Sequence, residues 1–207
     1  MSEIYGTIGL LSKGELIEVT RSDLVGEFVG QTAQKTQNII KKSIGNILFI
    51  DEAYSLSQGG HEDFGKEAVS ELVKEMEDKR EDLVVIAAGY VDEMHKFIDI
   101  NPGLQSRFNK YIVFDDYSPF ELLEIFNLML SKNKYKIPET LTSELLTYFN
   151  TVDKKTFSNA RGVRNLFEKM VEQQANRLIN IPNPSVDELN LLSEDDFRNA
   201  VNLMKTF

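Results

Sequence analysis

Two adjacent acidic residues, Asp51 and Glu52, are the strongest chemical signal in the sequence. They directly follow Ile47–Ile50, an apolar run with the composition of a buried strand in a parallel sheet. Because the carboxyl end of such a strand opens onto a crevice, both carboxylates are expected at a ligand site. In nucleotide hydrolysis one carboxylate holds Mg²⁺ and a second orients the attacking water. We therefore predict that Asp51 binds Mg²⁺ through water and that Glu52 acts on the attacking water. If the pair alone is considered, the alternative remains that these two acids end a strand without having a function.

The loop that would complete this chemistry, G-x-x-x-x-G-K-S/T, does not occur upstream of the acid pair. Its backbone N–H groups and its lysine make most of the contacts to nucleotide phosphates, so we expect residues 1–207 alone to bind ATP weakly. Residues 60–66 match every position of the motif except the last, where Glu67 replaces the required hydroxyl. Since a carboxylate there would repel phosphate, we predict a loop that enters a helix, not a phosphate site.

The elements that position the acids are predicted from hydrophobic periodicity. Four segments have strand composition: residues 15–19, 47–50, 83–88 and 111–114. Three segments with helical patterns separate them: residues 32–43, 63–79 and 92–98. Strands that alternate with helices pair in parallel through right-handed crossovers. The sequence therefore predicts an α/β subdomain over residues 1–116.

From residue 117 onward the pattern is helical throughout. Ser118 and Glu121 form a capping box, and Pro119 occupies the first helical position. Four helical segments follow: residues 119–130, 139–150, 159–179 and 194–203. We therefore predict an all-α subdomain over residues 117–207.

Composition narrows the classes of partner. The chain has 207 residues, 42% hydrophobic content and a formal net charge of −10. This acidity argues against nucleic acid or an anionic membrane as a partner. The sequence has no cysteine, which favours a reducing compartment, and we predict a cytoplasmic location. No stretch approaches the ~20 apolar residues of a membrane span.

Several motifs together resemble the AAA+ ATPases, specifically the branch that contains stage V sporulation protein K and CbbX, the red-type Rubisco activase. The matching segments occur in the same order as in that branch: residues 9–14, 23–30, 49–54, 88–90, 101–107 and 159–161. The resemblance implies a partial AAA+ core, a parallel sheet with flanking helices, followed by an α-helical lid subdomain. It also implies that the Walker A segment is missing from residues 1–207.

The resemblance implies roles for the residues on the α/β side. Asp51 and Glu52 correspond to the Walker B pair. Phe28, Val29 and Gly30 correspond to the pore loop that grips a translocating polypeptide. An aromatic loop residue folded back onto its own core is the alternative for this segment.

Three arginines and one tyrosine also acquire roles from the resemblance. Arg107 resembles the arginine finger that reaches the γ-phosphate of a neighbouring subunit, with a surface salt bridge as the alternative. Arg161 matches the sensor-2 arginine of the lid, and Arg164, three residues on, either assists it or is solvated. Tyr90 occupies the sensor-1 position, where many AAA+ proteins carry asparagine.

The resemblance implies an ATPase subunit that couples ATP binding and hydrolysis, with Mg²⁺, to protein remodelling by threading. Such subunits form rings, here expected to be hexameric, that act on a protein substrate which the sequence does not identify. Without the phosphate-binding loop we predict that residues 1–207 alone do not hydrolyse ATP. The alternative is a non-catalytic AAA+ fragment that acts only as a protein-binding module. A DNA-linked loader is disfavoured by the net charge of −10.

Overall fold

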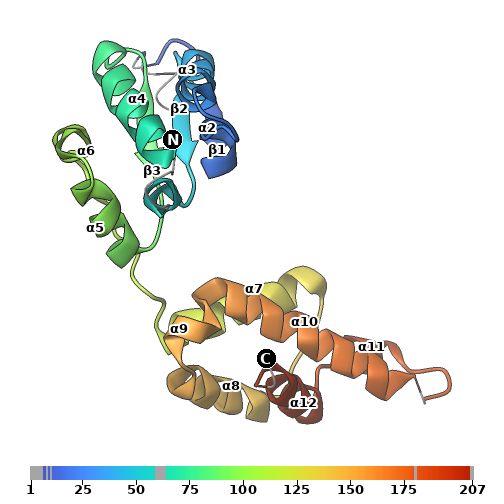
Figure 1. The fold of residues 1–207 in the computed structure, drawn as a ribbon. Coiled ribbons are helices and arrows are strands. Elements are labelled where there is room, and N and C mark those ends of the chain that lie inside the picture. The colour runs from blue at the N-terminus through green and yellow to red at the C-terminus, as the bar shows by residue number, and fades with distance from the viewer. Residues whose placement is uncertain (1–6, 8, 10, 59–63, 180, 206–207) are drawn as a thin grey trace. The chain divides into compact units, whose positions relative to one another are not determined.

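The structure, a computed structural model, describes residues 7, 9, 11–58, 64–179 and 181–205. The chain divides into two compact units, Met1–Val113 and Phe114–Phe207. Figure 1 shows that the first unit contains the strands and the second consists of helices. The predicted fold class, a partial α/β core followed by an all-α part, is confirmed.

Three short strands form the sheet of the first unit. They are β1 (Leu16–Val19), β2 (Ile47–Ile50) and β3 (Val84–Ala87), hydrogen-bonded in the order β1-β2-β3 and all parallel. The register aligns Val19 with Ile50 and Ile50 with Ala87, so the three strands end at the same edge. The residues that follow them are therefore brought together at that edge, as the sequence predicts.

The helices of the first unit cover the sheet and carry its connections. They are α2 (Arg21–Leu24), α3 (Gln31–Ser43), η1 (Ala53–Ser57), α4 (Gly65–Asp78), α5 (Val91–Asp99) and α6 (Pro102–Arg107). The helices α3 and α4 pack against each other, because each connects neighbouring parallel strands with the same hand. Leu48, Ile50, Leu72 and Phe97 are fully buried in the core that results.

The prediction of a fourth strand at residues 111–114 is wrong. Tyr111, Ile112, Val113 and Phe114 lie in neither a helix nor a strand, and they are between 61% and 90% exposed. A strand needs a hydrogen-bonded neighbour, and no strand within the described residues pairs with this segment. Its β-branched and aromatic composition predicted a strand, but composition does not supply a partner.

The second unit is a helical bundle with its own core. Its helices are α7 (Pro119–Asn133), α8 (Glu139–Thr151), α9 (Lys154–Phe157), α10 (Asn159–Leu178), α11 (Val186–Asn190) and α12 (Glu194–Met204). The four long helices were predicted, whereas α9 and α11 were not. Phe126 and Phe167 meet edge to face at 6.1 Å in the core. Among the helices that the structure describes, none combines the length and apolar character needed to cross a membrane.

Polar contacts fasten α12 to α10. Arg177 donates from Nε and Nη2 to the two carboxylate oxygens of Asp196, at 3.0 and 2.9 Å. Asp196 also accepts from the backbone N–H of Ser193 and completes the capping box that opens α12. On α10, the buried Gln174 amide donates to backbone carbonyls of the segment before α12, at 2.9 Å for Leu189 and 3.0 Å for Leu191. Buried polar groups are thus paired, which fixes the position of α12.

Candidate functional site

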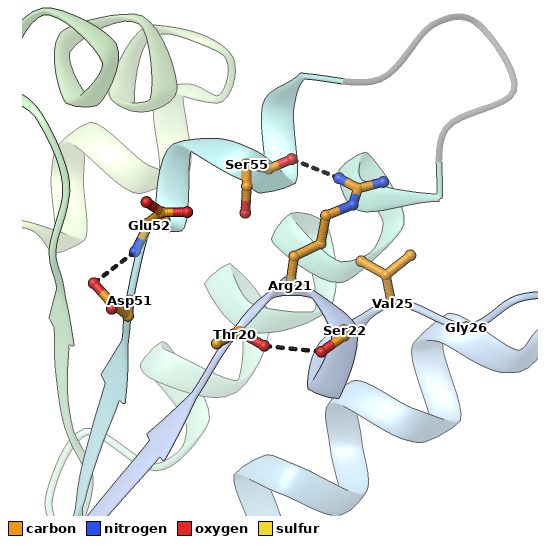
Figure 2. Close-up of a pocket in the computed structure, with 8 residues that line it drawn as sticks. All are labelled: Thr20, Arg21, Ser22, Val25, Gly26, Asp51, Glu52 and Ser55. Atoms are coloured by element: carbon orange, nitrogen blue, oxygen red, sulfur yellow. Dashed lines mark hydrogen bonds between the residues drawn. The ribbon is translucent and has the colours of Figure 1, made fainter. Parts of the chain in front are cut away.

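A pocket of about 560 Å³ opens at the carboxyl ends of β1 and β2 (Figure 2). Eight described residues line it: Thr20, Arg21, Ser22, Val25, Gly26, Asp51, Glu52 and Ser55. The two predicted acids therefore lie together on a concave surface at the edge of the sheet. Ligands of open parallel sheets bind at this edge, beyond the carboxyl ends of the strands.

The backbone at the acid pair turns sharply out of the sheet. Asp51 still donates its N–H to the Val19 carbonyl oxygen at 2.9 Å, while its Oδ1 accepts from the Glu52 N–H at 3.0 Å. Glu52 has φ 48° and ψ 46°, a left-handed conformation that is uncommon for a residue other than glycine. Such conformations concentrate at functional sites. The turn leaves both carboxylates exposed and starts η1 at Ala53.

Tyr54 connects Glu52 to the end of β3. Burial, then the charge of Glu52 and a hydrogen bond to its carboxylate, raise the pKa of the Tyr54 hydroxyl. The Tyr54 ring lies 6.3 Å from the ring of Tyr90, which follows β3. A Cβ on Gly89 would lie 2.6 Å from the Tyr54 ring, so this packing requires glycine. The candidate sensor-1 residue is thus linked to the acid pair through an aromatic contact.

Asp51 is the residue predicted to bind Mg²⁺. Its carboxylate is a hard oxygen ligand on the pocket surface, and Mg²⁺ is commonly held by one or two carboxylates together with phosphate and water. Within the described ranges, no cluster of three or more metal-binding side chains occurs. The residues present therefore fit a Mg²⁺ that is bound jointly with a nucleotide phosphate.

Arg107, at the end of α6, does not line the pocket. Its Nη2 lies 3.4 Å from Glu77 Oε2, and its Nη1 donates to Ser106 Oγ at 2.9 Å and to the Gly103 carbonyl oxygen at 3.3 Å. Its Nε is buried without a hydrogen-bond partner. Within this chain the guanidinium thus contacts its own helix and the end of α4 rather than Asp51 or Glu52.

The candidate pore loop projects into solvent. Phe28 is 67% exposed and Val29 is 86% exposed. Gly30 has φ +79° and opens α3, with no atom within 4 Å of where a Cβ would lie. The alternative in which this aromatic residue folds back onto its own core therefore does not hold for Phe28.

Arg161 and Arg164 lie in the first turns of α10, in the second unit, and both are exposed. The start of α10 is fixed by Asn159, which donates to Asp116 Oδ1 at 2.7 Å and accepts from the Tyr117 N–H at 3.0 Å. Neither guanidinium forms an ion pair with another residue in the part of the chain that the structure describes. Both arginines are thus exposed near the start of a helix whose first residue is fixed by hydrogen bonds.

The pocket also contains residues to which the sequence assigned no role. Thr20, Arg21 and Ser22 directly precede the matching segment of residues 23–30, and their place on the pocket was not predicted. The available signal was their position directly after a predicted strand, because parallel strands end at a common edge. Residues 59–63, which include most of the rejected phosphate-loop match, lie outside the described residues.

Two sequence profiles match nearly the whole chain. The profile described as "ATPase family associated with various cellular activities (AAA)" matches residues 3–116, and the "AAA lid domain" profile matches residues 118–206. Stage V sporulation protein K of Bacillus subtilis is 50% identical over 183 residues, 86% of this chain and 57% of that protein. Protein CbbX of Cereibacter sphaeroides is 41% identical over 202 residues, 96% of this chain and 65% of that protein.

A solved structure shares the fold at low sequence identity. The crystal structure of the FIGL-1 AAA domain in complex with ADP matches with a TM-score of 0.63 and 16% identity, over 91% of this chain and 62% of that one. The chain thus spans less than two thirds of the length of the two relatives named above. It belongs to the AAA family of ATPases, carries an AAA lid domain, and has stage V sporulation protein K and CbbX among its relatives.

Proposed function

We propose that this chain forms the Walker B and lid portion of an ATPase subunit that remodels a protein substrate by threading it. The observation that carries this proposal is the placement of Asp51 and Glu52 on a pocket at the carboxyl edge of the sheet. A metal-binding acid and a water-orienting acid at this edge are what nucleotide hydrolysis requires. The absence of cysteine suits a reducing compartment, and we place the activity in the cytoplasm.

Within the pocket the two acids have different tasks. Asp51 holds Mg²⁺ through water, and the metal when bound neutralises charge on the nucleotide phosphates. Glu52 orients the attacking water, and its left-handed backbone turns its carboxylate out of the sheet at the pocket surface. The missing phosphate contacts come from a G-x-x-x-x-G-K-S/T loop, which residues 1–207 do not contain.

We propose that three arginines also act on nucleotide, Arg107 on that of a neighbouring subunit and Arg161 and Arg164 from the lid domain. Arg107 acts on the nucleotide of a neighbouring subunit in a hexameric ring, which is consistent with its place away from its own pocket. Its planar guanidinium can form paired hydrogen bonds to phosphate oxygens. Arg161, with Arg164 one turn further on, contacts nucleotide from the lid, and Tyr90 occupies the sensor-1 position.

The protein substrate meets the exposed loop of Phe28, Val29 and Gly30. Two exposed apolar side chains next to a glycine can contact a polypeptide without strict sequence preference, because apolar contacts are non-directional. The same loop supports the alternative function, a binding module without hydrolysis. ATP turnover therefore decides between the two.

The test supplies the phosphate-binding loop. A segment that carries G-x-x-x-x-G-K-S/T on a strand and a helix is fused before residue 3, and ATP turnover is measured. We expect turnover by the fusion, its loss in Glu52→Gln and Arg107→Ala, and its retention in Arg80→Ala, a control that removes the other arginine paired with Glu77.

Residues 1–207 are tested in parallel without the added segment. We expect no hydrolysis, and binding of Mg²⁺-ATPγS weaker than about 100 μM, which corresponds to roughly −5.5 kcal/mol. Tighter binding that is lost in Arg161→Ala would show that the loop is not needed for nucleotide binding. A folded fusion that binds nucleotide but never hydrolyses it would favour the binding module.

A further inference from the structure

Arg21 joins two parts of the first unit that lie far apart in the sequence. Its Nη1 donates to the Ser55 carbonyl oxygen at 2.6 Å, a part-buried hydrogen bond across 34 positions of the chain (Figure 2). Arg21 opens α2, at the end of β1, while Ser55 lies in η1 after the acid pair. A charged donor makes this hydrogen bond stronger than one between neutral groups.

On one side of this contact, η1 is continuous with Glu52. The Ser55 N–H donates to the Glu52 carbonyl oxygen at 2.8 Å, and the Ser55 carbonyl also accepts from the Gln58 N–H at 3.3 Å. Ser55 therefore belongs to the short turn that sets the backbone of Glu52. A displacement of Glu52 would move the acceptor that Arg21 holds.

On the other side, α2 is tied to the candidate pore loop and to α3. The Val25 N–H donates to the Arg21 carbonyl oxygen at 2.9 Å, and the Gly26 N–H donates to Thr32 Oγ1 at 3.0 Å. Lys35 Nζ donates to the carbonyl oxygens of Ser22 and Val25, at 2.6 and 3.0 Å. The base of the loop that carries Phe28 and Val29 is thus held as one piece with Arg21.

A third segment also approaches the guanidinium. A Cβ on Gly65, the first residue of α4, would lie 2.8 Å from Arg21 Nη1 and 2.2 Å from the Leu56 carbonyl oxygen. The absence of a side chain at Gly65 therefore makes room for the Arg21–Ser55 contact. Three elements therefore meet at the Arg21 guanidinium: the start of α2, the start of α4 and the middle of η1.

We infer that Arg21 is a positioning residue that couples the backbone at Glu52 to the exposed loop of Phe28, Val29 and Gly30. In this role it acts through the backbone of η1: it transmits a displacement of η1 to the base of the loop. The inference rests on the proposed function, since it links the proposed hydrolytic site to the proposed polypeptide-binding loop. Arginine suits the position because its rigid fork reaches the carbonyl while its stem remains in α2.

The coupling is tested by hydrogen exchange on residues 1–207 without nucleotide. Peptides covering residues 25–30 and 53–57 are followed in Arg21→Ala, Arg21→Lys and Lys35→Ala. We expect exchange roughly tenfold faster in both peptides of Arg21→Ala, since the substitution removes the charge-assisted hydrogen bond between the two segments. Arg21→Lys, which keeps a charged donor, should restore part of the protection in both.

Lys35→Ala is the matched control, because Lys35 holds the same loop base and, among the described residues, its hydrogen bonds go to Ser22 and Val25 rather than to η1. It should speed exchange over residues 25–30 and leave 53–57 unchanged. The inference is overturned if Arg21→Ala speeds hydrogen exchange in only one of the two segments. It is also overturned if Lys35→Ala speeds exchange equally in both. Because no nucleotide is present, failure of the proposed ATPase function would not affect this measurement.

Discussion

Single residues set the local path of the backbone, and two glycines, one in each unit, do so for different reasons. Gly162, in the first turn of α10, lies where a Cβ would be 1.8 Å from the Phe157 carbonyl oxygen. Gly30, at the start of α3, has φ +79° and open space around it. The first position excludes a side chain by contact, whereas the second disfavours one by conformation.

These two reasons predict different losses of stability on substitution by alanine. Gly162→Ala should lower the free energy of unfolding of the second unit by about 3 kcal/mol or more, because backbone would have to move. Gly30→Ala should lower that of the first unit by only about 1 kcal/mol. Urea denaturation of both variants measures the difference. Equal losses of stability in the two variants would mean that the backbone near Gly162 moves at little cost to admit a methyl group.

At this scale the sequence predicted the acid pair but not Arg21. Asp51 and Glu52 were predictable because their position depends only on where a buried strand ends. Arg21 was not, because its partner is a backbone carbonyl at Ser55, and every residue offers such an acceptor. The left-handed backbone of Glu52 could not be predicted either, because it follows from the turn into η1, and no residue pattern predicted that turn.

At the scale of elements, the attachment of α12 depends on one carboxylate. Asp196 is 2% exposed and paired with Arg177, whereas its neighbour Asp195 is 80% exposed and lies 3.9 Å from Arg198. Asp196→Asn should destabilise the second unit by about 2–3 kcal/mol, because it removes the charge that a part-buried arginine faces. Asp195→Asn, the control, should change stability by less than about 0.5 kcal/mol. Chemical denaturation that ranks the two variants equally would contradict this prediction.

The Asp196 carboxylate also makes the stability of the second unit depend on pH. Burial opposes ionisation of Asp196, but hydrogen bonds from Arg177 and Ser193 outweigh it, so its pKa lies below the ordinary value of 3.8. A lowered pKa in the folded state contributes stability above pH 3.8 that is lost as pH falls through the lowered value. Denaturation midpoints measured between about pH 5 and pH 2 should therefore fall less steeply in Asp196→Asn than in the unmodified chain.

Elements were predictable where their own residues decide them. The long helices show an apolar stripe and clear caps, such as the Ser118–Glu121 box that opens α7. The strands β2 and β3 are continuous apolar runs between helices. Residues 111–114 have equally good strand composition, yet a strand exists only with a neighbour, and pairing is not a property of the segment itself.

At the scale of the whole chain, each of the two units has a separate hydrophobic core. A fragment of residues 114–207 should therefore fold without the first unit, because its core includes Phe126, Leu141, Leu145 and Met170 and, among the described residues, none from before 114. We expect a helical circular dichroism spectrum and a cooperative thermal transition. A fragment that is unfolded, or that melts without cooperativity, would show that the second unit needs the first.

The order of the strands in the sheet has a consequence for how the protein is made. Each strand pairs with the strand next to it in the chain, β1 with β2 and β2 with β3. Among the described strands, each ladder therefore closes over a single connecting segment, so none of these three must wait for a distant one of them to be synthesised. As the chain leaves the ribosome, this sheet can be assembled one strand at a time from its amino-terminal side.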